Sequence, residues 1–183
     1  ARDENHFYFH ISSRYLTLHG YGEPLLDRKI VEHVAQCSER GIPTYFSCVP
    51  ANIDVEKIVK LMAAGLGVLK FSMDALDDEG QKRIRGKHND FTASYEKILR
   101  VLEEKRRLGL ETVIVLTLIS MGTDDAAREM EQAFLAMWAD KEVYSYVKSQ
   151  DNRWYFEDDE AVENVSHYAQ QYCEYPWTSL SVM

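Results

Sequence analysis

The stretch Thr112-Val-Ile-Val-Leu-Thr-Leu-Ile119 is the most apolar part of the chain, and it decides the fold class. From Val113 to Leu118 it is apolar almost without interruption and rich in β-branched side chains, which favour strands. A strand with one wet face alternates apolar and polar side chains, whereas a parallel strand covered on both faces is a continuous apolar run. The stretch therefore predicts a strand of a parallel sheet with both faces buried.

Similar units lie on both sides of this strand. Each begins with a short β-rich run and continues with a helix whose apolar residues recur three and four positions apart. We expect strands at 14–19, 44–48, 68–72, 112–119 and 143–147, and helices at 27–40, 55–64, 91–108, 124–139 and 157–172. An acidic loop at 74–79, a short helix ending at Arg83 and a turn at 85–87 follow the third strand. Strand and helix in alternation indicate a parallel sheet with helical crossovers.

The repeated unit predicts an α/β protein, a partial (β/α) barrel of parallel strands with outer helices. A closed barrel needs eight units and typically about 250 residues, but the chain has 183 residues. The pattern also does not start with a strong strand, so a closed barrel does not fit and an open or partial barrel does. In such folds ligands bind at the carboxyl ends of the strands, which makes the residues directly after each strand the candidate site.

Charge and hydropathy exclude several classes of partner. Asp and Glu number 30 against 21 Lys and Arg, which gives a formal charge of −9. The longest basic run is the three residues 105–107, so a nucleic-acid partner is not expected. No apolar run approaches the ~18 residues of a membrane span, and the N-terminus does not resemble a signal peptide. We therefore expect a cytoplasmic protein with no membrane partner.

The three cysteines, Cys37, Cys48 and Cys173, are far apart in the sequence. No C-x-x-C or C-x-x-x-C spacing exists, so neighbours in this chain cannot build a local zinc or iron-sulfur site. An odd and sparse set also argues against a disulfide framework. The cysteines by themselves predict buried thiols in a reducing compartment.

The end of the first strand carries Gly20, Gly22, Glu23 and Pro24. Two glycines let the backbone turn tightly and approach a ligand, Glu23 supplies a carboxylate, and Pro24 stiffens the exit. The alternative is an ordinary turn between strand and helix.

The third strand ends in Ser72-Met-Asp74, and Arg85 follows 11 residues later. A guanidinium at this place can bind a ligand carboxylate through two parallel hydrogen bonds. The alternative is a surface salt bridge from Arg85 to Asp77, Asp78 or Glu79, for which Lys82 and Arg83 compete.

Taken together, Gly22-Glu-Pro-Leu-Leu26, Ser72-Met-Asp74, Arg85-Gly86 and the helix opening at Phe91 resemble the radical S-adenosylmethionine (SAM) superfamily, from about Arg14 to the end of the chain. The resemblance implies that Gly22, Glu23 and Pro24 lie against the amino group of SAM. It implies that Ser72 and Arg85 lie near the carboxylate and ribose of SAM.

The C-terminal stretch Cys173-Glu-Tyr-Pro-Trp177 resembles the start of the extension that binds auxiliary iron-sulfur clusters in some subfamilies, termed SPASM-like. This resemblance implies a partial barrel at 1–172 and the beginning of the extension at 173–183, with Cys173 as an auxiliary-cluster ligand. The alternative is a buried thiol beside Trp177.

The chain departs from the family in one respect. The family holds its catalytic four-iron, four-sulfur (4Fe-4S) cluster by C-x-x-x-C-x-x-C after an earlier strand, and this motif is absent. We expect a fragment that lacks its first unit, because the C-terminal motif is also cut at Met183; the alternative is a relative without a cluster. The aromatics 7–9 and His6 and His10 are candidate remnants of the missing region.

Several further residues are candidates with ordinary alternatives. His19 either faces the site or is a satisfied, half-buried histidine, and Asp74 either contacts ligand or caps a turn. Cys48 either donates a hydrogen atom to a substrate radical or fills the core. Five aromatics either line a substrate surface or pack: Tyr144, Tyr146, Trp154, Tyr155 and Phe156. The acidic residues 157–160 suit a helix N-terminus.

The resemblance implies a radical SAM enzyme that cleaves SAM reductively on the 4Fe-4S cluster and abstracts hydrogen from a substrate, with a peptide or protein as the expected substrate and an electron donor as a partner. This chain alone is then expected to be inactive. A different class of protein is a module without a cluster that binds a peptide or small ligand without catalysis. A third is a metal-free aldolase-type barrel, for which Lys70, on one face with Val68 and Ser72, is the available lysine.

Overall fold

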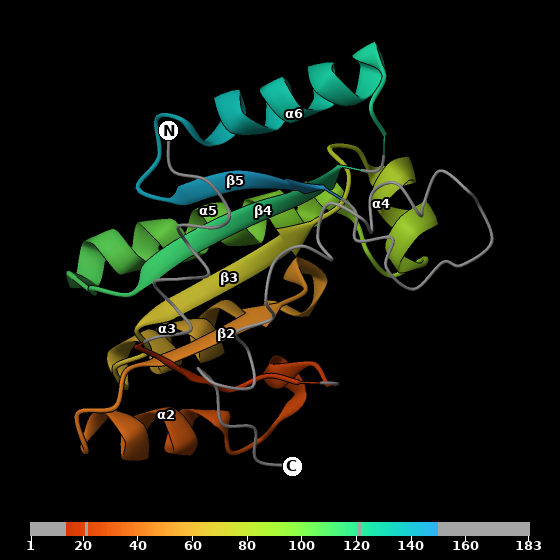
Figure 1. Cartoon of the computed structure of the whole chain (residues 1–183). Coiled ribbons are helices and arrows are strands. Elements are labelled where there is room, and N and C mark those ends of the chain that lie inside the picture. The colour runs from red at the N-terminus through yellow and green to blue at the C-terminus, as the bar shows by residue number, and fades with distance from the viewer. Residues whose placement is uncertain (1–13, 21, 121, 150–183) are drawn as a thin grey trace, which may run out of the picture.

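A parallel five-stranded sheet forms the centre of the molecule (Figure 1). The computed structural model describes residues 14–20, 22–120 and 122–149. The strands are β1 (Leu16–Thr17), β2 (Thr44–Cys48), β3 (Val68–Met73), β4 (Val113–Ser120) and β5 (Tyr144–Ser149), in the order β1-β2-β3-β4-β5. All four neighbouring pairs are parallel. Strands that follow one another in space as in sequence, without a reversal, make this sheet part of a barrel wall, as expected.

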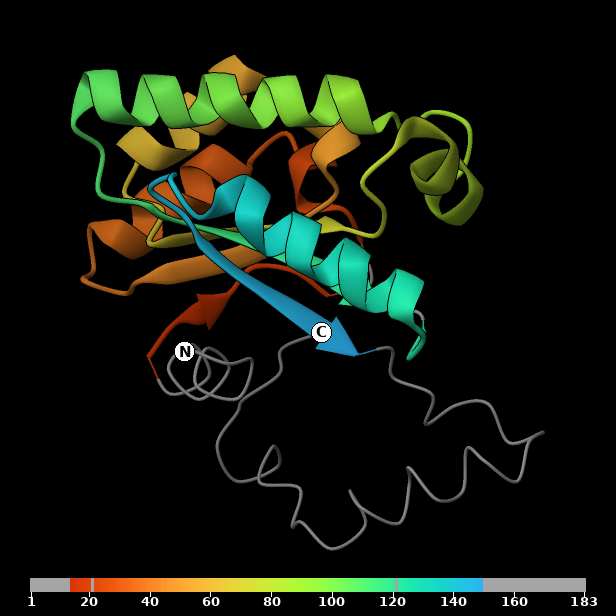
Figure 2. The same cartoon turned by 90° about the horizontal axis from the view of Figure 1, so that it is seen from above.

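Helical segments connect the strands. They are η1 (Pro24–Leu26), α2 (Ile30–Ser38), η2 (Pro50–Asn52), α3 (Val55–Ala63), α4 (Asp78–Arg85), α5 (Phe91–Leu108) and α6 (Asp125–Trp138). Figure 2 shows the helices along one side of the sheet. Side chains at their N-caps fix where several begin; Asp54 accepts from the backbone N–H of Glu56 and Lys57, and Asp90 from that of Ala93.

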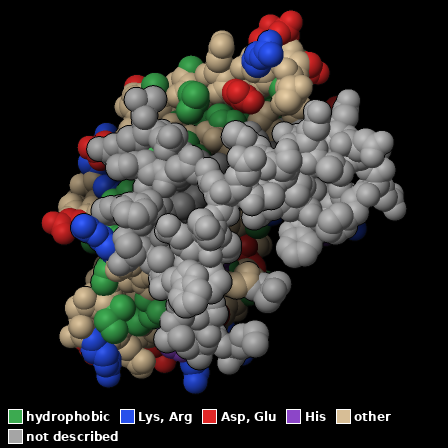
Figure 3. Space-filling view, in the orientation of Figure 1, with side chains coloured by type: hydrophobic (Ala, Val, Ile, Leu, Met, Phe, Trp, Pro, Cys, Tyr) green, Lys and Arg blue, Asp and Glu red, His purple; other side chains and the backbone are tan. Residues whose placement is uncertain are grey.

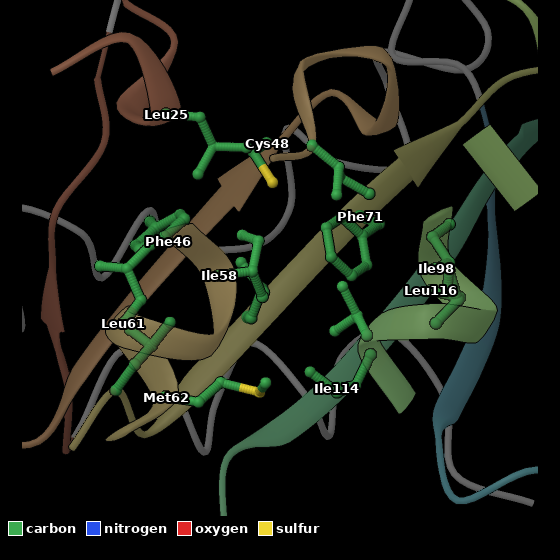
Figure 4. Packing of buried hydrophobic residues seen from close by; sticks show 14 of the residues in the cluster. Leu25, Phe46, Cys48, Ile58, Leu61, Met62, Phe71, Ile98, Ile114 and Leu116 are labelled. Atoms are coloured by element: carbon green, nitrogen blue, oxygen red, sulfur yellow. The ribbon is translucent and has the colours of Figure 1, made fainter. Parts of the chain in front are cut away.

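The main core lies between the sheet and the helices. Phe46 from β2, Phe71 from β3 and Leu116 from β4 are wholly buried against Ile58 of α3 and Ile98 of α5 (Figure 4). Burying a side chain of this size stabilises the fold by roughly 1.5–3 kcal/mol. This layer holds the strands in register, and it therefore holds their carboxyl ends side by side.

The opposite face of the sheet carries a second, smaller cluster. Tyr45, Val68, Val115 and Tyr146 are buried there, one from each of four adjacent strands. Val115 therefore packs on one face of β4 while its neighbours Ile114 and Leu116 pack on the other. The prediction that the most apolar stretch is covered on both faces is confirmed.

The expected element bounds differ from the observed ones in a few places. The first strand is two residues long instead of six, and α2 begins at Ile30 instead of Asp27. The acidic stretch 74–79 is partly helical because Asp77 caps α4, accepting from the backbone N–H of Gly80. Arg85 ends this helix and does not lie in a turn. The expected helix at 157–172 and the two-part division at residue 172 lie outside the described residues.

Two features of the described helices and side chains concern the surface. No helix in the described ranges combines the length and the apolar character that crossing a bilayer requires. On the face shown in Figure 3, the visible acidic and basic side chains of described residues are interspersed.

Candidate functional site

The carboxyl ends of the strands point to one side of the molecule, the side on which α4 lies (Figure 1). The residues predicted from the sequence lie on segments at this edge: Glu23 after β1, Ser72 near the end of β3, and Arg85 at the end of α4. Parallel pairing places the ends of β1, β2 and β3 next to one another. The fold therefore gathers these three residues at the edge where ligands bind in such sheets.

Glu23 links two of these segments. Its Oε2 accepts a hydrogen bond from the backbone N–H of Val49, directly after β2, over 3.0 Å. Its Oε1 accepts from the N–H of Leu25 over 3.4 Å, which caps η1. Pro24 begins η1 and is buried. The carboxylate thus holds the segment after β1 against the segment after β2.

Gly22 lies beside this link and is exposed. A Cβ placed on Gly22 would meet no atom within 4 Å. The packing of the described residues therefore does not require glycine at this position, and the space beside its backbone is open.

Ser72 pairs with Ser47 of the neighbouring strand. The two hydroxyl oxygens lie 3.1 Å apart, and both are half-buried. The N–H of Ser47 donates to Nδ1 of His19 over 3.2 Å. A chain of polar contacts thus runs across β2 from His19 through Ser47 to Ser72. Of the two alternatives for His19, its hydrogen bond and partial burial support a satisfied, half-buried histidine.

The protonation state of His19 follows from its surroundings. Burial, together with a smaller contribution from the charge of Lys70, lowers the pKa of His19 from 6.5 to about 4. The ring is therefore neutral at pH 7. Because Nδ1 accepts from Ser47, the ring proton is on Nε2.

Lys70 lies on the same face of β3 as Val68 and Ser72, as alternation predicts. Its Cα is the register partner of Ser47 and of Val115, and its side chain is 7% exposed. Lys70 is the third of the six residues of β3, so it is not at the strand end, where the aldolase-type alternative requires a lysine.

Arg85 pairs with Asp74 and not with the acidic residues first considered as its partners. Nε of Arg85 donates to Oδ2 of Asp74, whose side chain is 3% exposed. The alternative of a surface salt bridge from Arg85 to Asp77, Asp78 or Glu79 is therefore wrong. Lys82 pairs instead with Asp90 over 2.9 Å. Among the described residues, Nη1 and Nη2 of Arg85 have no hydrogen-bond partner.

Gln81 also belongs to this group, and reasoning from the sequence missed it. Its Oε1 accepts from the backbone N–H of Asp74 over 3.3 Å and of Ala75 over 3.1 Å, and the residue is 1% exposed. The available signal was its spacing of four residues from Arg85, which puts both on one face of a helix.

Cys48 lies on the other face of the sheet. Its thiol packs in the helix-side core near Leu25 and Phe46 and is 3% exposed (Figure 4). Burial raises the pKa of Cys48 well above its usual value, and the charge of Glu23 adds to this effect. Cys48 therefore fills the core, and its placement contradicts the alternative role of hydrogen-atom donor at the site.

Metal-binding side chains do not gather in the described part of the chain. Cys37 and Cys48 lie on α2 and β2, and no three His, Cys, Asp or Glu side chains of described residues are placed to hold a metal. Cys173, Trp154, Tyr155 and Phe156 lie outside the described residues. The residues described here do not fit a 4Fe-4S cluster.

Comparison with known proteins identifies the family to which the chain belongs. The family model described as the radical SAM superfamily matches residues 10–134, more than half of the chain. The chain belongs to the radical SAM superfamily. Members of this superfamily bind SAM and a 4Fe-4S cluster. Gly22, Glu23, Pro24, Ser72 and Arg85 all lie within the matched range, and Cys173 lies beyond it.

Two solved structures share the fold. Coproporphyrinogen III oxidase from Escherichia coli superposes with a TM-score of 0.52 at 18% identity, over 72% of this chain and 30% of that one. A domain of pyruvate-formate lyase-activating enzyme from Bacteroides vulgatus superposes with a TM-score of 0.50 at 14% identity, over 73% of this chain and 98% of that domain. This chain thus spans less than a third of the oxidase. No curated protein matched the sequence.

Proposed function

We propose that the protein containing this radical SAM chain is an enzyme that cleaves SAM reductively and abstracts a hydrogen atom from its substrate. The observation that carries the proposal is Arg85, whose Nε is bound to buried Asp74 while Nη1 and Nη2 have no partner among the described residues. A guanidinium fixed at one nitrogen presents its other donors in a fixed direction, which suits a carboxylate. SAM carries such a carboxylate.

The other proposed SAM contacts lie at the same edge of the sheet. Ser72 has a half-buried hydroxyl that Ser47 orients, and a hydroxyl both donates and accepts, as binding to a ribose requires. The open space beside Gly22 lets the backbone approach a ligand. In this proposal Glu23 acts through its hydrogen bonds to Val49 and Leu25, which hold the Gly22-Glu23-Pro24 segment in place.

The described residues do not supply the ligands of the 4Fe-4S cluster in this proposal. Because Cys37 and Cys48 do not fit it, we propose that three thiolates outside the described residues hold the catalytic cluster. We also propose Cys173 as a ligand of an auxiliary cluster in an extension that begins near 173. A peptide or protein substrate, which rests on the resemblance of the C-terminal stretch alone, and an electron donor for the reductive cleavage complete the proposal.

The experiment uses the intact protein, reconstituted anaerobically with iron and sulfide. We expect the protein to bind iron and to form 5′-deoxyadenosine and methionine from SAM. We also expect calorimetry to show SAM binding that Arg85→Ala weakens about tenfold or more, because the variant loses a well-aligned hydrogen bond to a charged group. Arg128→Ala, at an exposed pair with Asp125 on α6, is the matched control and leaves SAM affinity unchanged. Reconstituted protein that neither binds iron nor cleaves SAM overturns the proposal.

The alternative function is a module that binds a ligand at the same strand ends without a cluster. The finding that favours it is the lack of a cluster site among the described residues. Iron content separates the two functions, because an intact protein without iron that still binds a peptide or a small anion supports the module.

A further inference from the structure

We propose that Gln81 is a positioning residue that sets Arg85 for ligand binding by fixing Asp74. The proposal deepens the proposed function and rests on it for the identity of the ligand, the carboxylate of SAM. The contacts that carry it are independent of any ligand, and all of them lie between the exit of β3 and helix α4.

Gln81 holds the backbone where β3 ends. Its side-chain oxygen accepts from two consecutive N–H groups, those of Asp74 at 3.3 Å and Ala75 at 3.1 Å. The side chain is nearly fully buried, at 1% exposure, so these two donors have no access to water if the amide is removed. An amide oxygen with two lone pairs satisfies both donors at once, and Gln81 therefore fixes the direction in which the chain leaves the strand.

Asp74 carries this constraint to Arg85. Its carboxylate is 3% exposed and accepts from Nε of Arg85, whose own side chain is 31% exposed. A buried carboxylate is destabilising unless a cation pairs with it. The position of the Arg85 guanidinium therefore depends on where the backbone of Asp74 is held. Because Nε is the bound nitrogen, the outer edge of the guanidinium, Nη1 and Nη2, remains for a ligand.

Helix α4 binds the exit of β3 twice through residues on one face. Gln81 and Arg85 are four positions apart, so they lie one above the other on the helix. Gly80 allows the helix to lie this close, because a Cβ at that position would stand 2.8 Å from Cβ of Ala75. The charged contacts of Lys82 with Asp90 and of Asp78 with the N–H of Thr92 join α4 to the start of α5 and leave Asp74 to Arg85.

The first test needs no SAM. In protein labelled with ¹⁵N-arginine, the Nε–H of Arg85 in the wild type exchanges slowly with water, because Asp74 accepts it. In Gln81→Leu we expect exchange to be faster by about tenfold, the equivalent of one hydrogen bond lost. Gln132→Leu, an exposed glutamine on α6, is the control and does not change this exchange.

If Gln81→Leu does not fold, Gln81→Asn serves in its place. Its amide is one methylene shorter and cannot reach both N–H groups, so we expect a change in the same direction and of smaller size. Slow exchange in a folded Gln81 variant, equal to that of the wild type, overturns the proposal.

The second test measures SAM affinity of the reconstituted intact protein by calorimetry. We expect Gln81→Leu to bind SAM about tenfold more weakly and Gln81→Leu/Arg85→Ala to bind no more weakly than Arg85→Ala, since Gln81 acts through Arg85. If the two effects multiply in the double variant, Gln81 acts by another route and the proposal is wrong. Absence of SAM binding by the wild type overturns the proposed function instead, while the exchange of the Arg85 Nε–H still decides whether Gln81 positions Arg85.

Discussion

Oε2 of Glu23 accepts a hydrogen bond from the backbone N–H of Val49 over 3.0 Å, across 26 residues of sequence. This contact joins the segment after β1 to the segment after β2. It explains how a carboxylate at the candidate site serves the fold, because a charged acceptor makes a stronger hydrogen bond than a neutral one.

Removing this carboxylate should cost stability. We expect Glu23→Ala to lower the free energy of unfolding by about 2 kcal/mol, because hydrogen bonds from two backbone N–H groups to a charged group are lost. Urea unfolding of the protein measures the change. Glu56→Ala, which removes an exposed ion pair with Lys60 on α3, should cost clearly less, because exposed pairs contribute little to stability. Equal effects of the two substitutions would contradict the structural role of Glu23.

The hydroxyls of Ser47 and Ser72 should be coupled. We expect Ser47→Ala and Ser72→Ala each to cost about 1 kcal/mol of stability, and the double variant to cost clearly less than their sum, because either substitution alone breaks the shared hydrogen bond. A double-mutant cycle by urea unfolding gives the coupling. Strict additivity would show that the two hydroxyls do not interact in solution.

His19 should make stability depend on pH. Its pKa in the folded protein is about 4 against 6.5 for the free side chain. Between these values the unfolded chain binds a proton that the folded protein does not, so this contribution is fully present above pH 6.5 and is lost as the pH falls toward 4. Because the ring is partly exposed, solvent screening leaves about 1–2 kcal/mol.

The measurement is urea unfolding at pH 7 and at pH 4.5. His19→Asn keeps an acceptor near the position of Nδ1 but does not titrate, so the variant should lose this part of the pH dependence. His88→Asn, at an exposed histidine, is the control and should keep it. The prediction fails if His19→Asn and the wild type lose equal stability between the two pH values.

Two glycines that follow helices should respond differently to alanine. Gly41 after α2 and Gly65 after α3 have positive φ angles of 68° and 95°. A Cβ on Gly41 meets no atom within 4 Å, whereas one on Gly65 would lie 2.8 Å from Cβ of Ser38. We expect Gly41→Ala to cost about 1 kcal/mol from backbone strain alone and Gly65→Ala about 3 kcal/mol. Thermal and urea unfolding compare them, and a smaller cost at Gly65 would contradict the packing against Ser38.

The thiols of Cys37 and Cys48 should differ in reactivity. Cys48 is 3% exposed with a raised pKa, whereas Cys37 is half-buried on α2. We expect iodoacetamide at pH 8 to alkylate Cys37 at least tenfold faster in the folded protein, since only an accessible thiolate reacts. Peptide mass spectrometry measures both rates, and the difference should vanish in urea. Fast labelling of Cys48 in the folded protein would mean that it does not lie in the core.

Sequence patterns with a local physical cause were predicted well. The strand at 44–48 and the helix at 91–108 have the expected bounds, because apolar spacing and the turn residues that bound them act within a few residues of each other. The short β1 was overestimated, since its length depends on pairing with β2 and not on its own composition. The alternative surface pairing of Arg85 with residues 77–79 was wrong, because several carboxylates lie near Arg85 in the sequence and only the fold decides which of them it meets.

The sequence by itself determined the α/β class, the sequential units of a partial barrel and the segments that reach the ligand-binding edge. Periodicity fixes which face of an element is apolar, and a parallel sheet brings the ends of its strands together. Only the tertiary structure decided that Arg85 pairs with Asp74, that Gln81 supports Asp74 and that Cys48 lies on the helix side. These contacts depend on strand register and on the docking of α4, and both are set by packing between residues far apart in the sequence.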